Sequence, residues 1–208
     1  IVSPDAERLA ACADEVLARL AAATRPLLMV GVEVRRYGLE ARVAELARLA
    51  PELRRTVEPA DLEFYGRDWT RRWTPAPLAI ALPASIAEVQ TIARWASAHR
   101  VGLVPSGGRT GLSGGAVAAN GELVVSFERM NRVVAFDAID RTLTVQPGIA
   151  LEAVHNAARE HGLIYPVDFA ARGSCSIGGN IATNAGGIRV IRYGNTRELV
   201  LGLEVVLP

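Results

Sequence analysis

The sequence predicts an α+β fold, because its helical and strand patterns lie in separate stretches and do not alternate regularly. Strand patterns dominate residues 101–150, whereas residues 5–49 and 86–99 carry mainly helical periodicity. The chain has 208 residues, of which 50% are hydrophobic, enough to bury the core of one large domain or two small ones. These observations exclude a disordered protein.

The first 50 residues form a predicted helix–strand–helix segment. Residues 5–23 are rich in Ala and Leu with helical spacing, the apolar run Leu27–Val30 is typical of a short strand, and a second helical pattern covers Leu39–Leu49. The composition then becomes polar and aromatic, most clearly in Glu58–Trp73. We therefore expect residues 51–77 to connect this segment to the next domain by crossing a surface.

A strand–helix–strand unit follows, and we take it as the start of a domain that covers residues 78–208. The apolar run Leu78–Leu82 predicts a strand, and Ile86–His99 has helical periodicity. Ser85 and Glu88 have the spacing of a capping box, which predicts the start of this helix. The next strand, Gly102–Pro105, leads directly into a glycine-rich run.

Three further strands are predicted before the chain returns to helix, at Glu122–Phe127, Arg132–Asp137 and Thr142–Gln146. Asp140 and Arg141 supply a hairpin turn between the last two of them. A helix is predicted over Leu151–Glu160, and Gly162 is placed to end it. The run Leu201–Leu207 is predicted as a closing strand.

Ten of the 19 glycines lie in two short runs, Pro105–Gly115 and Arg172–Gly187, which also contain Ser, Thr and Asn. Glycine lets a ligand approach main-chain N–H groups closely, and successive amides can form an anion-binding concavity. We expect the amides of residues 106–114 to surround a diphosphate, with hydroxyl donors from Ser106, Thr110 and Ser113. Two such runs predict one extended ligand that is held at two points.

Two common phosphate-binding architectures are excluded. Neither run has the G-x-G-x-x-G pattern at a strand-to-helix turn that a Rossmann site requires. A Walker A loop requires a lysine, and every basic side chain other than histidine in this sequence is arginine. Any phosphate site in these runs must therefore have another architecture.

Charge and composition limit the partners and the compartment. The net charge of +1 provides no overall field that would attract nucleic acid or an anionic membrane. The only cysteines, Cys12 and Cys175, show no C-x-x-C spacing, so a reducing cytoplasm fits best. No apolar stretch is long enough to span a bilayer. Because the chain begins at Ile1 and stops at Pro208 just after a strand-like run, we expect it to be a fragment.

Four motifs occur together in a characteristic order. They are PSGGRTGLSGG, then QPG at Gln146–Gly148, then GSCSIGGNIATNAGG, then RYG at Arg192–Gly194 followed by LGLEVVLP. This pattern, over residues 50–208, resembles the FAD-linked oxidase family related to vanillyl-alcohol oxidase. Within it, the chain is most similar to flavin-dependent D-2-hydroxyacid dehydrogenases, which act on D-lactate, glycolate or D-2-hydroxyglutarate. The resemblance implies two α+β subdomains, about 78–130 and 131–208, with FAD extended between them.

The resemblance also implies which residues hold FAD. The first run would hold the pyrophosphate through Pro105, Ser106, Gly107, Gly108, Arg109, Thr110, Gly111, Leu112, Ser113, Gly114 and Gly115. Pro147 and Gly148 would line the cleft. The ribityl chain and isoalloxazine would contact Gly173, Ser174, Ser176, Ile177, Gly178, Gly179, Asn180, Ala182, Thr183 and Asn184. Val206 would lie near the flavin or adenine edge.

The expected function is oxidation of a D-2-hydroxyacid by hydride transfer to N5 of FAD, with an unspecified electron acceptor. Some relatives bond FAD covalently through a histidine where this chain has Arg109, so we expect noncovalent FAD; Arg109 then either pairs with a phosphate or is solvated. The catalytic residues are unknown, since the resemblance places the substrate-side histidines in a C-terminal half that this chain lacks. This fragment alone is therefore expected to be inactive. The alternative is a noncatalytic FAD-binding or electron-transfer module of a larger complex.

Other candidate residues have structural interpretations beside functional ones. His99, His155 and His161 are expected to be structural, and their spacing predicts no metal site. Cys175 is expected to be inert. The aromatic side chains of the connecting segment either stack on a ligand or cover apolar surface: Tyr65, Trp69 and Trp73. Four arginines either bind a substrate carboxylate or are solvated: Arg71, Arg72, Arg189 and Arg192.

The N-terminal segment fits this family less well. Residues 25–50 resemble part of the central domain of thiamine-diphosphate-dependent decarboxylases, which implies a fusion. An unrelated N-terminal extension remains the alternative. Because the similar stretch contains no catalytic motif, we infer no thiamine chemistry.

Overall fold

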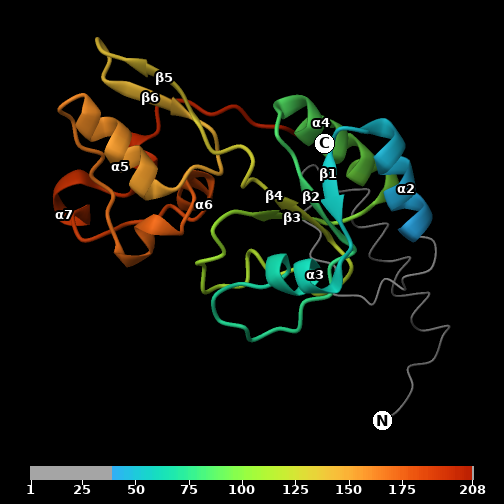
Figure 1. The fold of residues 1–208 in the computed structure, drawn as a ribbon. Helices are drawn as coiled ribbons and strands as arrows, with labels where there is room; N and C mark the ends of the chain where they lie inside the picture. Colours follow the sequence, from blue (N-terminus) through green and yellow to red (C-terminus); the bar gives the residue numbers. More distant parts are fainter. Residues whose placement is uncertain (1–38, 208) are drawn as a thin grey trace, which may run out of the picture. The chain divides into compact units, whose positions relative to one another are not determined.

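A computed structural model describes residues 39–207 of the chain (Figure 1). By its contacts the chain divides into two units, and all of the described residues belong to the second, Val34–Pro208. The helix expected at residues 5–23, the strand expected at Leu27–Val30 and Cys12 lie outside the described residues. All of the elements below belong to the second unit.

A four-stranded sheet is built from strands β1 (Arg54–Thr56), β2 (Ala79–Leu82), β3 (Leu103–Ser106) and β4 (Leu123–Ser126), in the order β1-β2-β4-β3. Strand β4 is parallel to both β2 and β3, and β1 pairs antiparallel with β2. Since β4 lies between β2 and β3, these two strands are not neighbours although they follow each other in sequence. The carboxyl ends of β3 and β4 therefore end side by side, at Ser106 and Ser126.

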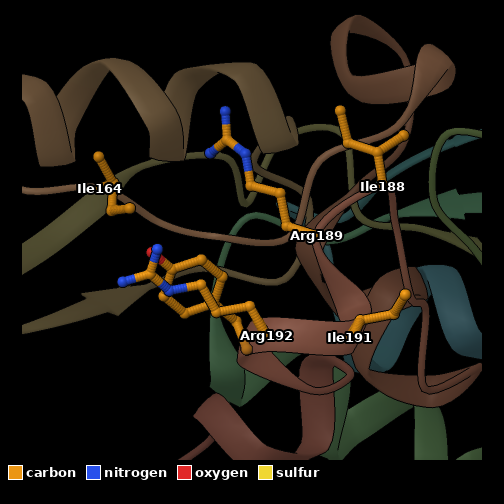
Figure 2. Close-up of a pocket in the computed structure, with 6 residues that line it drawn as sticks. Ile164, Ile188, Arg189, Ile191 and Arg192 are labelled. Atoms are coloured by element: carbon orange, nitrogen blue, oxygen red, sulfur yellow. The ribbon is translucent and has the colours of Figure 1, made fainter.

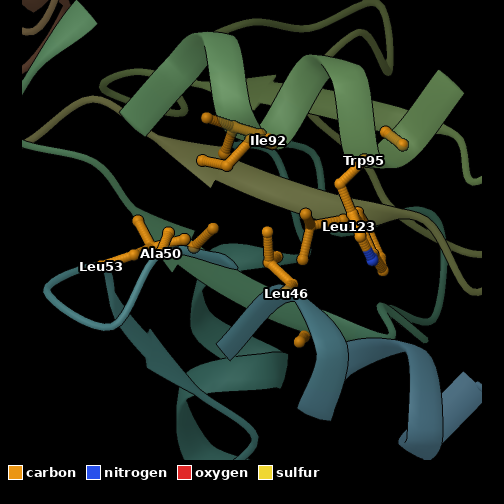
Figure 3. Packing of buried hydrophobic residues seen from close by; sticks show 10 residues of the cluster. Leu46, Ala50, Leu53, Ile92, Trp95 and Leu123 are labelled. Carbon is orange, nitrogen blue, oxygen red and sulfur yellow. The ribbon is translucent and has the colours of Figure 1, made fainter. Parts of the chain in front are cut away.

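Two helices, α2 (Leu39–Leu49) and α4 (Ile86–His99), share one hydrophobic core with the sheet (Figure 3). The expected cap begins α4, because Oγ of Ser85 accepts from the Glu88 N–H at 3.2 Å. Side chains alternate across a strand, so every second strand residue enters this core. Its buried members are Leu46, Ala50, Leu53, Ala79, Ala81, Ile92, Trp95, Ala96, Leu123 and Val125.

A second cluster uses the intervening strand residues, and helix α3 (Pro59–Tyr65) packs against it. Its buried members are Ile80, Leu82, Val104, Ala118 and Val124, with Leu62 and Tyr65 of α3 packed against them. Strand β1 and α3 lie in the stretch expected only to connect. Short elements are hard to see in a sequence, and α3 begins with a proline and has no fully buried residue to mark a face.

The rest of the unit starts with an antiparallel ribbon of β5 (Val133–Asp137) and β6 (Thr142–Val145). Its turn is stabilised by Oδ1 of Asp137, which accepts the N–H groups of Ile139 at 2.8 Å and Asp140 at 2.9 Å. Helix α5 (Leu151–Glu160) follows, and Gly162 has a φ of +69° just after it, as expected of a helix end. A third core cluster joins this part: Ile149, Leu151, Val154, Val167, Cys175 and Ile177.

Short helices, which were not expected, occupy much of the chain after residue 169. They are η1 (Ala170–Gly173), α6 (Ile177–Ala182), α7 (Val190–Tyr193) and η2 (Thr196–Leu199). The strand expected at residues 201–207 is wrong, because this stretch pairs with no strand in the described part of the chain. Its apolar side chains, such as Leu201 and Leu207, are mostly exposed, and an apolar run forms a strand only where a partner lies beside it. Within residues 39–207, no helix combines the length and apolar character needed to cross a membrane.

Candidate functional site

The first glycine run leaves the sheet at the carboxyl end of β3. Ser106 and its register partner Ser126 on β4 are both completely buried. Neither Oγ has a hydrogen-bond partner among the described residues. A buried hydroxyl without a partner is uncommon, so Ser106 and Ser126 both have hydrogen-bonding capacity to offer a polar group of a ligand at this end of the sheet.

The main chain of the run has unused donors. In the described part of the chain, no N–H group of residues 108–113 donates a hydrogen bond. Gly111, Leu112 and Ser113 are also exposed, so a ligand can reach these amides. Successive unpaired N–H groups in a loop attract an anion. The residues present therefore fit the diphosphate of FAD.

Two glycines of the first run lie directly against the second run. A Cβ on Gly107 would overlap Oγ of Ser176, and a Cβ on Gly108 would overlap the main-chain carbonyl of Ser174. Glycine at these positions permits an approach that any side chain would prevent. The two runs, which are far apart in sequence, thus meet in the folded chain.

The QPG motif joins the same junction. The N–H of Gly178 donates to the carbonyl of Pro147 at 2.8 Å, and the N–H of Ile177 donates to the carbonyl of Ile149 at 2.9 Å. A Cβ on Gly148 would overlap the main-chain carbonyl of Phe127, just beyond β4. All three expected cofactor motifs are therefore brought together.

Within the second run, the buried residues lie at the start of α6. Ser176 caps this helix by accepting the Gly179 N–H at 3.4 Å, and Asn180 is buried with no hydrogen-bond partner for Nδ2 among the described residues. Cys175 packs in the core, and burial raises the pKa of its thiol, which disfavours the reactive thiolate. Ala182 and Thr183 are exposed at the end of the helix.

Arg109 is not simply solvated, and its expected pairing with a phosphate stays a prediction. Its guanidinium carbon lies 4.3 Å from the ring centroid of Phe64 and 4.9 Å from that of Tyr65, both on α3. Nη1 also donates to the carbonyl of Gly107 at 3.3 Å. Burial lowers the pKa of this guanidinium, but arginine remains charged in proteins. Its backbone is left-handed, with a φ of +55°.

Asp68 is a site residue that sequence reasoning missed. Its buried carboxylate accepts the Gly114 N–H at 3.1 Å, so this amide of the first run is already paired. Burial by itself raises the pKa of Asp68, but hydrogen bonds from Thr70, Gly114 and Arg71 hold it below its usual value. No sequence signal pointed to Asp68, because a contact across 46 residues has no local pattern.

The remaining candidate residues have varied surroundings. Nη2 of Arg189 lies 3.8 Å from Oδ2 of Asp168. With Arg192, Arg189 lines an open pocket of about 470 Å³ that is otherwise mostly apolar (Figure 2), whose other members are Ile164, Ile188, Ile191 and Tyr193. Arg71 and Arg72 are exposed. Trp69 is 72% exposed, which leaves little of it to cover apolar surface. Val206 is partly buried within the otherwise exposed residues 201–207.

The histidines make structural contacts. His99 pairs with Glu45 at 3.1 Å, and the Nε2 of buried His155 lies 2.7 Å from the carbonyl of Val167. The ring of His161 stacks on Phe136 with centroids 3.6 Å apart. Among the residues that the structure describes, no group of side chains is arranged to hold a metal ion.

The sequence signature of the family described as "FAD binding domain" matches residues 77–208. The chain belongs to this family of FAD-binding domains. The family expected from the motifs is confirmed, and FAD is the cofactor that it indicates. The match begins just before β2 and includes all three motifs that meet in the structure.

Curated relatives of this FAD-binding domain are longer proteins. The chain is 75% identical over 165 residues to a protein named D-2-hydroxyglutarate dehydrogenase from Xanthomonas citri pv. viticola, an alignment that covers 79% of this chain and 35% of the relative. It is 56% identical over 165 residues to a protein of the same name from Stutzerimonas stutzeri, covering 76% and 36% of the two chains. The chain thus spans about a third of the length of these relatives.

Solved structures share the fold of the domain. An alkyldihydroxyacetonephosphate synthase superposes with a TM-score of 0.72 at 21% identity, covering 88% of this chain and 36% of that one. A chitooligosaccharide oxidase superposes with a TM-score of 0.66 at 22% identity, covering 76% and 33%. At such identities the likeness concerns the fold alone, and it confirms the expected α+β FAD-binding architecture.

Proposed function

We propose that this chain is the FAD-binding part of a flavoprotein that oxidises a D-2-hydroxyacid. The single observation that carries the cofactor site is the run of unpaired N–H groups at residues 108–113, held against the second glycine run. The substrate class rests on the relatives named D-2-hydroxyglutarate dehydrogenase, one of them 75% identical over the aligned residues. D-2-hydroxyglutarate is therefore the first substrate to test.

Different segments of the chain bind different parts of FAD. The first run, Pro105–Gly115, binds the diphosphate mainly through main-chain amides. Pro147, Gly148 and the second run, from Gly173 to Asn184, approach the ribityl chain and the ring system, where small side chains leave room for a flat group. Val206 contacts an edge of the cofactor. We also propose the subdomain division near residue 130, which agrees with the separate core clusters on either side of it.

When bound, FAD supplies the redox chemistry by accepting hydride at N5 from the α-carbon of the hydroxyacid. This chain supplies position and hydrogen-bond donors, and we assign none of its described residues to catalysis. FAD is held noncovalently, since Arg109 offers no nucleophile and its guanidinium lies over the rings of α3. The electron acceptor is not specified by these residues. The two widely separated cysteines support a reducing, cytoplasmic location.

Titration of the purified chain with FAD tests the cofactor site. We expect saturable binding that Gly111→Ala weakens about tenfold or more, because a Cβ there enters the space proposed for the diphosphate. Among the described residues, no atom beyond the two chain neighbours lies within 4 Å of that Cβ, so stability should not change. Gly202→Ala is the matched control, since its Cβ is equally unobstructed and lies outside both runs. A folded chain that ignores FAD contradicts the proposal.

The same sample tests the mode of attachment and the substrate class. After acid denaturation, all of the flavin should pass through a filter that retains the protein. Flavin that stays with the protein would contradict noncovalent binding. In the full-length protein that contains this chain, anaerobic D-2-hydroxyacid should bleach the flavin absorbance, whereas the L enantiomer should not. These 208 residues alone should bleach slowly or not at all.

A further inference from the structure

The segment between α3 and β2 is hydrogen-bonded to the far end of the first glycine run. The Ala118 N–H donates to the carbonyl of Gly66 at 2.9 Å, and the Ala76 N–H donates to the carbonyl of Ala118 at 2.8 Å. The Gly121 N–H also donates to the carbonyl of Ala76 at 2.9 Å. Residues 66–76 therefore form a fixed support beside residues 114–121.

Asp68 is the polar centre of this support. Oδ1 accepts the N–H of Thr70 at 2.9 Å and its hydroxyl at 2.7 Å, while Oδ2 accepts the Gly114 N–H at 3.1 Å. The side chain of Thr70 thus orients the carboxylate toward the run. With 4% of its surface exposed, Asp68 has little water to replace any of these donors.

Gly114 is held from a second side by Trp73. It has a φ of +81°, and a Cβ on it would lie 3.1 Å from Cη2 of the Trp73 ring. Its carbonyl also accepts the Val117 N–H at 3.0 Å. The amide, the carbonyl and the Cα of this one residue are all restrained, at the point where the unpaired donors of residues 108–113 end.

A buried carboxylate beside a phosphate-binding loop needs an explanation, because its charge opposes the approach of a diphosphate. We propose that Asp68 is a positioning residue: it fixes Gly114, and so the loop conformation in which residues 108–113 keep their N–H groups unpaired, before FAD binds. This inference rests on the proposed role of the first run. Preorganised donors bind an anion more tightly because less ordering is required on binding.

The substitution Asp68→Asn separates this role from a simple charge effect. It keeps the size of the side chain and removes the charge. An amide has one acceptor oxygen, so it cannot accept from both Thr70 and Gly114 as the two carboxylate oxygens do. If only charge mattered, losing the repulsion would tighten FAD binding. If Asp68 positions the loop, FAD binding weakens, by about 10- to 100-fold for one lost charge-assisted hydrogen bond.

Asp137→Asn is the matched control. Asp137 also accepts two main-chain N–H groups in a turn, but that turn joins β5 to β6 and not the glycine runs. We expect its FAD dissociation constant to equal that of the wild type. Thr70→Val is the second variant, for the case in which Asp68→Asn does not fold. It removes the hydroxyl that donates to Oδ1 and keeps the main-chain N–H donor, so it should weaken FAD binding by a smaller factor, about 3- to 10-fold.

Hydrogen exchange of the Gly114 amide in the FAD-free chain provides a measurement that does not depend on FAD. The amide should be protected in the wild type and in Asp137→Asn, and should exchange faster in Asp68→Asn and Thr70→Val. A wild-type chain that shows this protection yet never binds FAD would contradict the proposed function but leave the support intact. FAD binding by Asp68→Asn or Thr70→Val that is unchanged or tighter, or unchanged Gly114 exchange in these variants, overturns the inference.

Discussion

The phenol of Tyr65 donates a hydrogen bond of 2.7 Å to Oε2 of Glu128, which lies just beyond β4. Partial burial, together with this bond to a carboxylate, raises the pKa of Tyr65 to about 12. The guanidinium of Arg109 lies over the same ring, so a single side chain of α3 contacts both the first glycine run and the end of the sheet. The side chains that contact the first glycine run therefore include aromatic rings of α3 and the carboxylate of Asp68.

The raised pKa of Tyr65 predicts a pH dependence at the alkaline end. The folded state favours the protonated phenol, so its contribution to stability is fully present below the unfolded pKa of about 10 and is lost as the pH rises through about 12. Tyrosine ionisation can be followed by absorbance in the wild type and in Tyr65→Phe. The difference between the two titration curves should show one tyrosine that ionises near pH 12. Glu128→Gln should move this step toward 10, and a Tyr65 step near 10 in the wild type would contradict the assignment.

The two glycine runs act as one structural element, because their main chains touch. Gly108→Ala should therefore destabilise the fold by about 1–3 kcal/mol, since its Cβ overlaps the Ser174 carbonyl and a main chain must move. For Gly115→Ala, in the same run, the new Cβ lies more than 4 Å from every described atom beyond its two chain neighbours, so stability should change by less than about 0.5 kcal/mol. Urea unfolding measures both. Equal free energies of unfolding for the two variants would show that the runs are not packed together in solution.

At the scale of the whole molecule, α2 packs into the same core as the sheet. Leu46 is 1% exposed in the cluster that also contains Leu123 of β4. The expected domain boundary at residues 50 and 51 stays a prediction, and Leu46→Ala tests it. If α2 folds with the sheet, this variant should lower the free energy of unfolding by about 2–5 kcal/mol in a single transition.

Leu49→Ala is the control for that measurement, because Leu49 is on the same helix but 56% exposed. It should change the free energy of unfolding by less than about 0.5 kcal/mol. The measurement can follow the fluorescence of the buried Trp95, which lies in the same cluster. If Leu46→Ala behaves like Leu49→Ala, α2 contributes little to the folding of the FAD-binding domain.

Elements with strong local signals were predictable from the sequence. Helices α2 and α4 have the expected bounds, and the Ser85 cap and the hairpin between β5 and β6 form as expected. Short elements such as α3 and α6 were missed, since a few residues carry no clear period. The apolar run at residues 201–207 was wrongly expected to be a strand, because pairing depends on a neighbour that the run itself does not specify.

The sequence by itself determined the cofactor class, because the glycine runs and the motifs around them are local patterns whose order identifies an FAD-binding domain. Only the tertiary structure decided how the first run is held. The contact of Gly108 with Ser174, the stacking of Arg109 on α3 and the bond from Gly114 to Asp68 all join residues distant in sequence. Such contacts arise from the path of the folded backbone, which brings the ends of separate elements together, and no spacing along the chain encodes them.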